Sequence, residues 1–521
     1  MKFLFSRRGQ MRWFLSGLVI WVGSSGNLSG AVSSRLWGND GEVWTPASRL
    51  PDFSHAGYHE GERAIPDVAQ VTNVKDFGAR GDGIADDTRA IQAAVAATQC
   101  GAVYLPPGRY KITDYIRLEK SGVVLRGAGP AKSVLWFPRG LDEIHPREMH
   151  ESRGLPTSGY AFDGAFLNIA GDYQAVTLAR IIAVASRGAS TVEVDDAARL
   201  TVGETVLVTA REAKDQSLKT YLYDGDPGDI SHGKALDTKM LLRIVAVHGT
   251  RVEFDRPLRF ETRAAWHAEI SRFRPTITEC GIEGLAFEFP ATQYRGHFME
   301  NGANAIELRS VYNCWVRDVV IRNGDLGINV VACGNTIMGV TFTADTGRGR
   351  VVDGVDCTGH HAIQCKNAQD NLITDFDFQT SYVHDLSVEH ASGNVYAHGR
   401  GADLCFDHHK DTPYDNLYTD IDCGLGSRVW HCGGGDGLGR HCARGGTFWN
   451  IRAVRPIAPP PKEWGAPGMT MVGFTTTTPE RLDPQGLWFE AVAPEQLAPR
   501  DLHAAQLARR LKVAKLAGSA K

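Results

Sequence analysis

The chain carries little net charge, which argues against nucleic acid and membrane surfaces as partners. Its 56 Lys and Arg residues stand against 60 Asp and Glu residues, so the formal net charge is −4, and charged residues make up 22% of the sequence. A balance this close to neutral gives no global attraction to nucleic acid or to a membrane surface. We therefore expect neither as a partner, and any attraction to an acidic polymer has to be local.

Long hydrophobic runs are also scarce. The one at the N-terminus extends from Trp13 to Val22, follows four basic residues and precedes a stretch of small residues. This layout is typical of a secretory signal peptide, and the run is shorter than a membrane-spanning helix requires. We predict a signal peptide over residues 1–31 and a secreted or periplasmic mature chain.

Several motifs that would indicate a cofactor or a nucleophile are missing. The string GGGDGLG at 433–439 lacks the Lys and the strand-to-helix setting of a phosphate-binding loop, and no Ser or Cys lies in a nucleophile motif. The string DGDPGD at 224–229 has carboxylates for calcium, but Asp, Gly and Pro are also ordinary turn residues. We therefore assign no metal ligands, and the cofactor, calcium included, stays unknown.

Cysteine is confined mainly to one region. Nine of the ten cysteines lie between Cys280 and Cys442, mostly in strand-like strings where a free thiol packs well. In an exported chain we favour a disulfide between Cys432 and Cys442, which flank the Gly-rich loop. His431 and His441 adjoin them, so a His/Cys metal site is the alternative.

The sequence contains an internal repeat. Similar strings begin at five asparagines with spacings of 22, 36, 23 and 22 residues: Asn313, Asn335, Asn371, Asn394 and Asn416. Such a period is typical of a solenoid with one coil per step, the long step carrying an insertion. Asparagines stacked at a recurrent turn can hydrogen-bond from coil to coil.

A capped helix and short strands precede the repeat. Asp86, Asp87 and Thr88 offer N-caps to a helix that ends before Gly101, and strand-like strings follow. The string DFGARGDGIADDTRAIQAAV at 76–95, with GAVYLPPGRYKI after it, resembles the opening of pectate-lyase-superfamily proteins, which are right-handed parallel β-helices. The resemblance implies that this helix caps the solenoid and that Asp82, Asp86 and Asp87 are structural. It does not fix the chemistry, because the superfamily contains lyases, hydrolases and non-enzymatic proteins.

The predicted fold is therefore all-β: a right-handed parallel β-helix with an N-terminal capping helix and a β-rich insertion. The insertion is indicated by alternating strands that lack the asparagine period. The predicted parts are the signal peptide at 1–31, an extended N-terminal segment at 32–70, the cap and first coils at 71–171, the insertion at 172–262, the β-helix with the active groove at 263–455, and a Pro-rich segment with a helix at 456–521.

Titratable residues gather in three successive coils. The strings before Asn371, Asn394 and Asn416 occupy equivalent stretches, so their outward side chains should share one surface, and nine of the 18 histidines lie between 360 and 441. Spacings of 24, 24 and 23 predict that His360, His384, His408 and His431 align along the axis. Stacked cations repel one another unless a ligand or carboxylates compensate, which favours a functional site here.

The cationic surface suits β-elimination of a uronic-acid polymer, which needs a cation at the sugar carboxylate, a base and a proton for the leaving oxygen. Arg400 or Lys366 would hold the carboxylate, His408, His409 or Lys410 would be the base, and Tyr382 or a second His would protonate the leaving group. The catalytic candidates are His408, His409, Lys410, His384, Arg400, Tyr382 and Asp407. The substrate-binding candidates are His360, His361, Lys366, His390, His398 and Asp403. We predict a secreted polysaccharide lyase whose partner is an acidic polysaccharide.

Two alternatives remain open. A glycoside hydrolase needs two carboxyl groups across the scissile bond, and Asp403 and Asp407 are the better pair because they border the histidines. A non-catalytic glycan-binding β-helix would use aromatic platforms. The sequence gives neither the sugar nor the oligomeric state.

Overall fold

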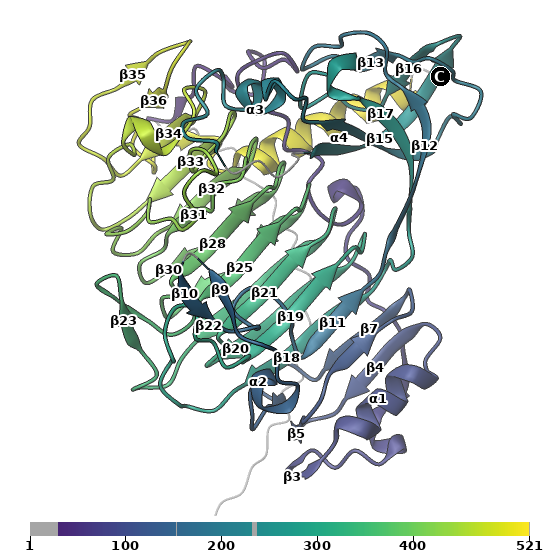
Figure 1. Cartoon of the computed structure of the whole chain (residues 1–521), viewed down its shortest axis with the longest axis vertical. Helices are drawn as coiled ribbons and strands as arrows, with labels where there is room; N and C mark the ends of the chain where they lie inside the picture. The colour runs from purple at the N-terminus through teal and green to yellow at the C-terminus, as the bar shows by residue number, and fades with distance from the viewer. Residues whose placement is uncertain (1–29, 153, 232–236, 520–521) are drawn as a thin grey trace, which may run out of the picture. The chain divides into compact units, whose positions relative to one another are not determined.

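Parallel strands dominate the computed structural model, which describes residues 30–152, 154–231 and 237–519. From Val32 onward the chain forms one compact unit, in which successive turns of chain stack parallel strands on one another (Figure 1). The prediction of an all-β parallel β-helix is confirmed by this topology. The predicted signal peptide lies, apart from its last residues, outside the described residues.

One wall is a seven-stranded sheet in which every pairing is parallel. Its strands, in spatial order, are β31 (Phe406–His408), β28 (His384–Glu389), β25 (His361–Lys366), β21 (Leu326–Val331), β19 (Asn304–Arg309), β11 (Leu167–Ala170) and β6 (Ile116–Leu118). Because the side chains of a strand alternate, one face of this sheet packs into the solenoid and the other faces outward.

The remaining walls form one continuous wrapped sheet. Its strands are β2 (Gln70–Asn73), β3 (Asp82–Asp86), β4 (Gly101–Leu105), β5 (Gly108–Lys111), β7 (Val123–Gly127), β8 (Ser133–Trp136), β18 (Gly281–Glu288), β20 (Trp315–Arg322), β22 (Thr336–Thr343), β26 (Leu372–Thr374), β27 (Asp377–Phe378), β29 (Val395–Ala397), β30 (Arg400–Gly401), β32 (Leu417–Asp422), β33 (Thr447–Arg452), β34 (Thr470–Phe474), β35 (Arg481–Leu482) and β36 (Trp488–Glu490).

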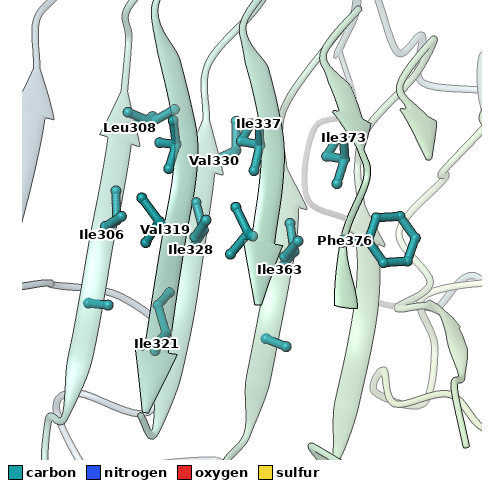
Figure 2. Packing of buried hydrophobic residues seen from close by; sticks show 14 of the residues in the cluster. Ile306, Leu308, Val319, Ile321, Ile328, Val330, Ile337, Ile363, Ile373 and Phe376 are labelled. Carbon is teal, nitrogen blue, oxygen red and sulfur yellow. The ribbon is translucent and has the colours of Figure 1, made fainter. Parts of the chain in front are cut away.

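The core is built from columns of apolar side chains, one per coil. Ile306, Ile328 and Ile363 are in register on the seven-stranded sheet, and Ile337 and Ile373 are in register on the opposing wall. Figure 2 shows the two columns facing each other. Each fully buried side chain of this size stabilises the fold by roughly 1.5–3 kcal/mol, so the repeat itself supplies the stability.

The asparagine ladder is confirmed for four of its five members. The Nδ2 atoms of Asn335, Asn371 and Asn394 donate to the Oδ1 atom of the next member at 3.1, 2.9 and 3.0 Å, ending on Asn416. Asn313 is not in the ladder, because the backbone N–H of Cys314 takes the equivalent place and donates to Asn335 at 2.9 Å. The chain there is shifted by one residue, which spacing alone does not show.

A capping helix lies beside the first coils. Helix α1 (Thr88–Ala97) follows Asp87, whose carboxylate accepts from the backbone of Arg80 and Gly81. Asp86 accepts from the Thr88 hydroxyl at 2.6 Å, and Asp82 accepts from two backbone N–H groups. The carboxylates of the DFGARGDGIADD string therefore hold the local loop, as the resemblance implied.

An antiparallel six-stranded sheet interrupts the coils where the sequence predicts an insertion (Figure 1). Its strands are β12 (Tyr173–Arg180), β13 (Thr191–Glu193), β14 (Thr205–Arg211), β15 (Asp237–His248), β16 (Arg251–Phe254) and β17 (Glu269–Pro275). The sheet continues past the predicted end at residue 262, because β17 pairs with both β12 and β14. It has its own apolar core.

Both ends of the compact unit lie on one wall. Trp37, Leu50 and Phe53 of the N-terminal segment are buried against Leu417 and Trp449 of the coils. The other short elements are β1 (Val32–Ser33) with β37 (Leu497–Ala498), β9 (His150–Ser152) with β10 (Leu155–Thr157), β23 (Arg350–Val352) with β24 (Val355–Cys357), α2 (Leu141–Ile144), α3 (Ser217–Leu222), α4 (Leu502–Ser519), η1 (Tyr58–Gly61), η2 (Val74–Phe77), η3 (Ala264–Trp266) and η4 (Lys462–Trp464). Among the described helices, none combines the length and apolar character needed to cross a bilayer.

Candidate functional site

The outward face of the seven-stranded sheet carries a polar row. Register pairs Glu307 with Asn329, Asn329 with Gln364, Gln364 with Ser387, and Ser387 with Asp407. All five are buried, and they alternate with the apolar side chains that face the core. The row therefore crosses β19, β21, β25, β28 and β31, and we call these five residues the polar floor.

Histidine rings converge on one end of the polar floor. His361 and His384 are the first residues of β25 and β28 and are paired in register, while His409 directly follows β31. The ring centroids of His361 and His409 lie 4.8 and 5.0 Å from that of His384. His360 and His297 adjoin them, with centroids 5.4 and 5.6 Å from His384. These five rings are the imidazole cluster.

Asp407 anchors the cluster through a hydrogen-bond chain. Its Oδ2 atom accepts from the Ser387 hydroxyl at 2.8 Å and lies 2.9 Å from His409 Nδ1. Because the Ser387 proton points to Asp407, the Ser387 oxygen accepts from His361 Nδ1 at 3.0 Å. The backbone N–H of Gly433 donates to the other carboxylate oxygen. The tautomers of both rings are thus set by one carboxylate.

The surroundings of the rings shift their pKa values in different directions. Burial, and then the neighbouring imidazoles, lower the pKa of His360 and His361 well below the usual value. Burial also lowers the pKa of His384, against the attraction of Asp407. For His409 burial acts the same way, but the charge and hydrogen bond of Asp407 outweigh it and raise the pKa. Burial disfavours ionised Asp407, yet His384 and His409 hold its pKa below the usual range.

Six of the predicted site residues are brought together. His360, His361, His384, His409 and Asp407 form the cluster or its anchor. Lys366 lies outward on β25, 2.9 Å from Glu389, and both act electrostatically on His409. Lys366 is a half-exposed cation beside the polar floor.

Two catalytic candidates point into the core, which corrects the prediction for both. His408 is in register with Val388, an inward residue, and packs on Tyr418, Phe448 and Trp464. Tyr382 is 1% exposed and packs on Phe342. The predicted axial alignment of His360, His384, His408 and His431 is wrong at His408, because β28 pairs His384 with His361 and places His408 four residues further along. The His431 ring does stack on that of His384, with centroids 6.1 Å apart.

The other predicted residues lie elsewhere. Arg400 belongs to β30 of the wrapped sheet and pairs with Asp377 at 2.8 Å, and His398 lies between Asp420 and Asp501. His390 pairs with Asp237 of the insertion at 3.1 Å. The two remaining candidates are Asp403, which accepts from Ser427, and Lys410, which follows the cluster in a left-handed turn. The residues predicted to share one surface therefore lie at several separate positions, and Asp403 is not part of the imidazole cluster.

The cysteine expectation changes, and the acidic string at 224–229 has protein partners. Cys432 and Cys442 are free thiols, so the favoured disulfide is wrong. Cys432 Sγ accepts from the backbone of His408, and His441 Nδ1 faces the His408 carbonyl, so the His/Cys set does not converge. In the DGDPGD string, Asp226 pairs with Arg440 at 2.5 Å and Asp224 accepts from the backbone of Gly468.

The structure adds residues that the sequence did not single out. His297 comes from the loop between β18 and β19, and Glu300 of the same loop lies 3.3 Å from His360 Nδ1. Burial raises the pKa of Glu300 to about 8. Neither has a repeated spacing, whereas Ser387 and Gln364 follow from β-alternation once the register is known. Two sets of ring nitrogens are close enough to bind a metal ion, His297–His360–His384 and His361–His384–His409.

The family match lies in the N-terminal coils. Residues 71–173 match the family described as rhamnogalacturonase A/epimerase, pectate lyase-like. Mannuronan C5-epimerase AlgE5 of Azotobacter vinelandii is 38% identical over 105 residues, 18% of this chain and 10% of that protein. Alginate lyase 7 of the same organism is 41% identical over 97 residues, 17% of this chain and 11% of that protein.

The chain thus spans about a tenth of the length of these curated relatives. Among solved structures, the tailspike protein gp49 from Pseudomonas phage LKA1 aligns with 78% of this chain and 64% of its own, with a TM-score of 0.46 and 14% identity. The predicted resemblance to pectate-lyase-like proteins is confirmed for the first coils.

Proposed function

We propose that this protein is a carbohydrate-active enzyme that cleaves a uronic-acid polysaccharide by β-elimination on the outward face of the seven-stranded sheet. The observation that carries the proposal is the chain from His361 through Ser387 to Asp407 and His409, at the end of a polar floor. Beside this buried row, the half-exposed Lys366 and the partly exposed His409 are the groups that a sugar polymer would contact. Two relatives that match less than a fifth of this chain are named for mannuronan and alginate, which are polyuronates.

The proposed steps use His409, Asp407 and Lys366. Lys366 neutralises the sugar carboxylate, which makes the proton on the adjacent carbon easier to remove. His409, in its neutral form, accepts that proton at Nε2 while Asp407 stabilises the resulting imidazolium. The C–H electron pair becomes the carbon–carbon double bond as the glycosidic C–O bond breaks. His409 then returns the proton to the leaving oxygen, and an unsaturated sugar remains.

This proposal differs from the prediction in its residues. Arg400 and Tyr382 take no part, because the first pairs with Asp377 on another wall and the second is enclosed in the core. The hydrolase alternative loses its pair, since Asp403 binds Ser427 and Asp407 is fully buried between Ser387 and His409. Secretion remains a prediction from the N-terminal sequence.

The test is incubation with a panel of uronate-containing and neutral polysaccharides, following both new reducing ends and ultraviolet absorbance. We expect both signals to rise together on an acidic polymer. Reducing ends without absorbance would indicate a hydrolase and contradict β-elimination. Binding without either signal, measured on the same polymers, would support the glycan-binding alternative.

A further inference from the structure

The imidazole cluster contains a set of three rings that take no step in the proposed elimination. His297 lies in the loop after β18, His360 directly before β25, and His384 at the start of β28. One ring nitrogen from each lies within 4.8 Å of the other two. The centroid of His360 is 4.5 Å from His297 and 5.4 Å from His384. Three segments far apart in the sequence thus place three nitrogens around one point.

Buried ring nitrogens in this set lack hydrogen-bond partners. His360 is fully buried and His384 is 2% exposed. Among the described residues, no hydrogen-bond partner is found for His360 Nε2 or for either nitrogen of His384. A buried polar atom left without a partner costs roughly 1–3 kcal/mol, so two such rings side by side are expensive unless a ligand occupies the space between them.

The opposite side of these rings carries the supports that metal-bound histidines use. His360 Nδ1 lies 2.9 Å from the Ala161 carbonyl, and His384 Nδ1 lies 3.4 Å from Asp407 Oδ2. A carbonyl or carboxylate at one ring nitrogen fixes the ring and directs the lone pair of the other nitrogen to the metal. His360 therefore has an outer acceptor at Nδ1 and an unpartnered Nε2, while Asp407 lies near His384 Nδ1 without a hydrogen bond to it.

We propose that His297, His360 and His384 bind a divalent transition-metal ion of the zinc class. Imidazole ligands favour zinc, copper or nickel over calcium and magnesium. Three histidines also leave a fourth coordination position open, as in catalytic zinc sites. His297 is the half-buried member, so the ion enters from its side of the cluster.

A second set, His361–His384–His409, shares His384 and meets the same distance limit. We assign the ion to the His297 set because this leaves His409 free for proton transfer, and this choice alone rests on the proposed function. An ion at the His297 set would be bound by His384, whose ring centroid lies 5.0 Å from that of His409.

The test uses full-length protein without a polyhistidine tag, stripped with a chelator and titrated with Zn²⁺ by calorimetry. Metal content after dialysis and the absorption spectrum of Co²⁺-loaded protein give two independent readouts. We expect about one ion per chain and an affinity that falls at least tenfold in His360→Gln and in His297→Gln. His409→Gln and the matched control His390→Gln should keep the affinity within about twofold. Circular dichroism checks that each variant is folded. If the variants of buried residues do not fold, His297→Gln, which changes a loop residue, still tests the metal site.

The outcomes separate the two proposals. Absence of saturable Zn²⁺ binding, or unchanged affinity in the folded His297 and His360 variants, would overturn the metal site and leave the elimination untouched. Loss of binding in His409→Gln but not in His297→Gln would move the ion to the other set and overturn the assignment. Tight binding by protein that forms no unsaturated product would support the metal site and contradict the lyase.

Discussion

At the scale of single residues, neighbours in the sequence have opposite roles. His408 and His409 are adjacent, but β31 directs the first ring into the core and leaves the second beside Asp407. Burial lowers the pKa of His408 to about 3, so its ring is neutral and acts as an apolar side chain. The function of each histidine is therefore decided by strand alternation and not by residue type.

This contrast gives a matched pair of variants. We expect His409→Ala to lower kcat by about 100-fold or more, because the group that moves the proton is lost. His408→Leu should keep kcat within about twofold. It should also leave the free energy of unfolding unchanged or raise it by about 1 kcal/mol, because it removes two buried nitrogens without partners among the described residues. Steady-state kinetics and urea unfolding measure both effects, and a loss of kcat in His408→Leu would contradict the assignment.

His398 predicts a pH dependence of stability. Hydrogen bonds to Asp420 and to Asp501 raise its pKa to about 10, while in the unfolded chain the value is about 6.5. The protonated ring therefore stabilises the fold fully below pH 6.5, and this contribution is lost as the pH rises through 10. The ring is 42% exposed, so solvent screening limits the effect to about 1 kcal/mol.

The measurement compares wild type with His398→Gln in urea unfolding at several pH values. We expect the wild type to be more stable than the variant at pH 6 and the difference to shrink toward pH 10. A difference that is constant with pH would show that the ring contributes by packing alone.

At the scale of elements, a repeated turn joins one coil to the next. Asn394 accepts from the backbone and the side chain of Asn371 and donates to Asn416. Because every member is buried, each lost side chain leaves hydrogen-bonding groups of its neighbours unsatisfied.

We expect Asn394→Ala to lower the free energy of unfolding by about 2–3 kcal/mol. The control is Asn39→Ala, which changes an exposed residue outside the ladder and should cost less than about 0.5 kcal/mol. Denaturant unfolding measures both. Equal effects from the two variants would mean that the ladder is not a source of stability.

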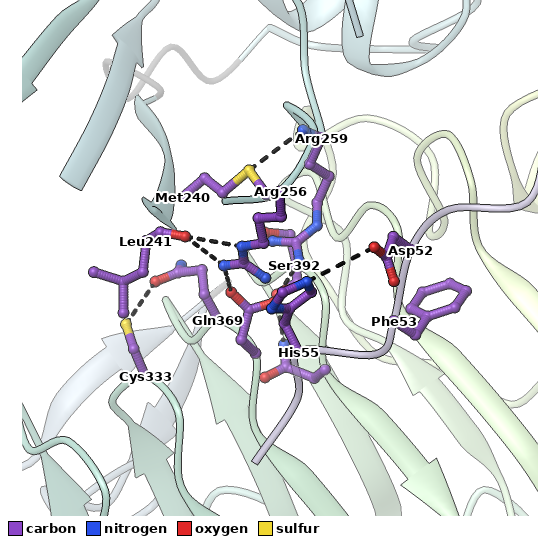
Figure 3. A network of polar contacts seen from close by, with 12 residues as sticks. Asp52, Phe53, His55, Met240, Leu241, Arg256, Arg259, Cys333, Gln369 and Ser392 are labelled. Atoms are coloured by element: carbon purple, nitrogen blue, oxygen red, sulfur yellow. Dashed lines mark hydrogen bonds and ion pairs between the residues drawn. The ribbon is translucent and has the colours of Figure 1, made fainter. Parts of the chain in front are cut away.

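At the scale of the whole compact unit, a buried ionic network joins the insertion to the coils. Arg256 and Arg259 of the insertion both bind Asp370 of the coils, the former at 2.6 Å. Figure 3 shows the two guanidinium groups, with Asp52 and His55 of the N-terminal segment beside them. Glu60 of the same segment accepts from His55 at 2.6 Å. Three parts of the chain thus meet at one set of charges.

Removal of the shared carboxylate should be costly. We expect Asp370→Ala to lower the free energy of unfolding by about 3–5 kcal/mol, because two guanidinium groups remain buried without their partner. Asp195→Ala breaks an exposed pair with Arg180 and should cost less than about 1 kcal/mol. A small effect of Asp370→Ala in the same unfolding assay would mean that water reaches the arginines.

The sequence alone determined the repeat and its class. The asparagine spacing and the capped helix were enough for a parallel β-helix with an insertion, because each coil repeats the same local chemistry and local patterns are visible in one dimension. It also located the coils that carry His361, His384, Asp407 and His409. Asn313 shows the limit, since a shift of one residue put Cys314 in the ladder and no spacing revealed it.

Only the tertiary structure decided which side chains meet. The pairing of His361 with His384, and of His408 with Val388, depends on turn lengths between coils, and a change of register by one residue reverses the face of every side chain. His297 and Glu300 reach the cluster from a loop more than 50 residues upstream, so no local pattern marks them. Convergence from distant segments is a property of packing, and this is why the site residues could be predicted only in part.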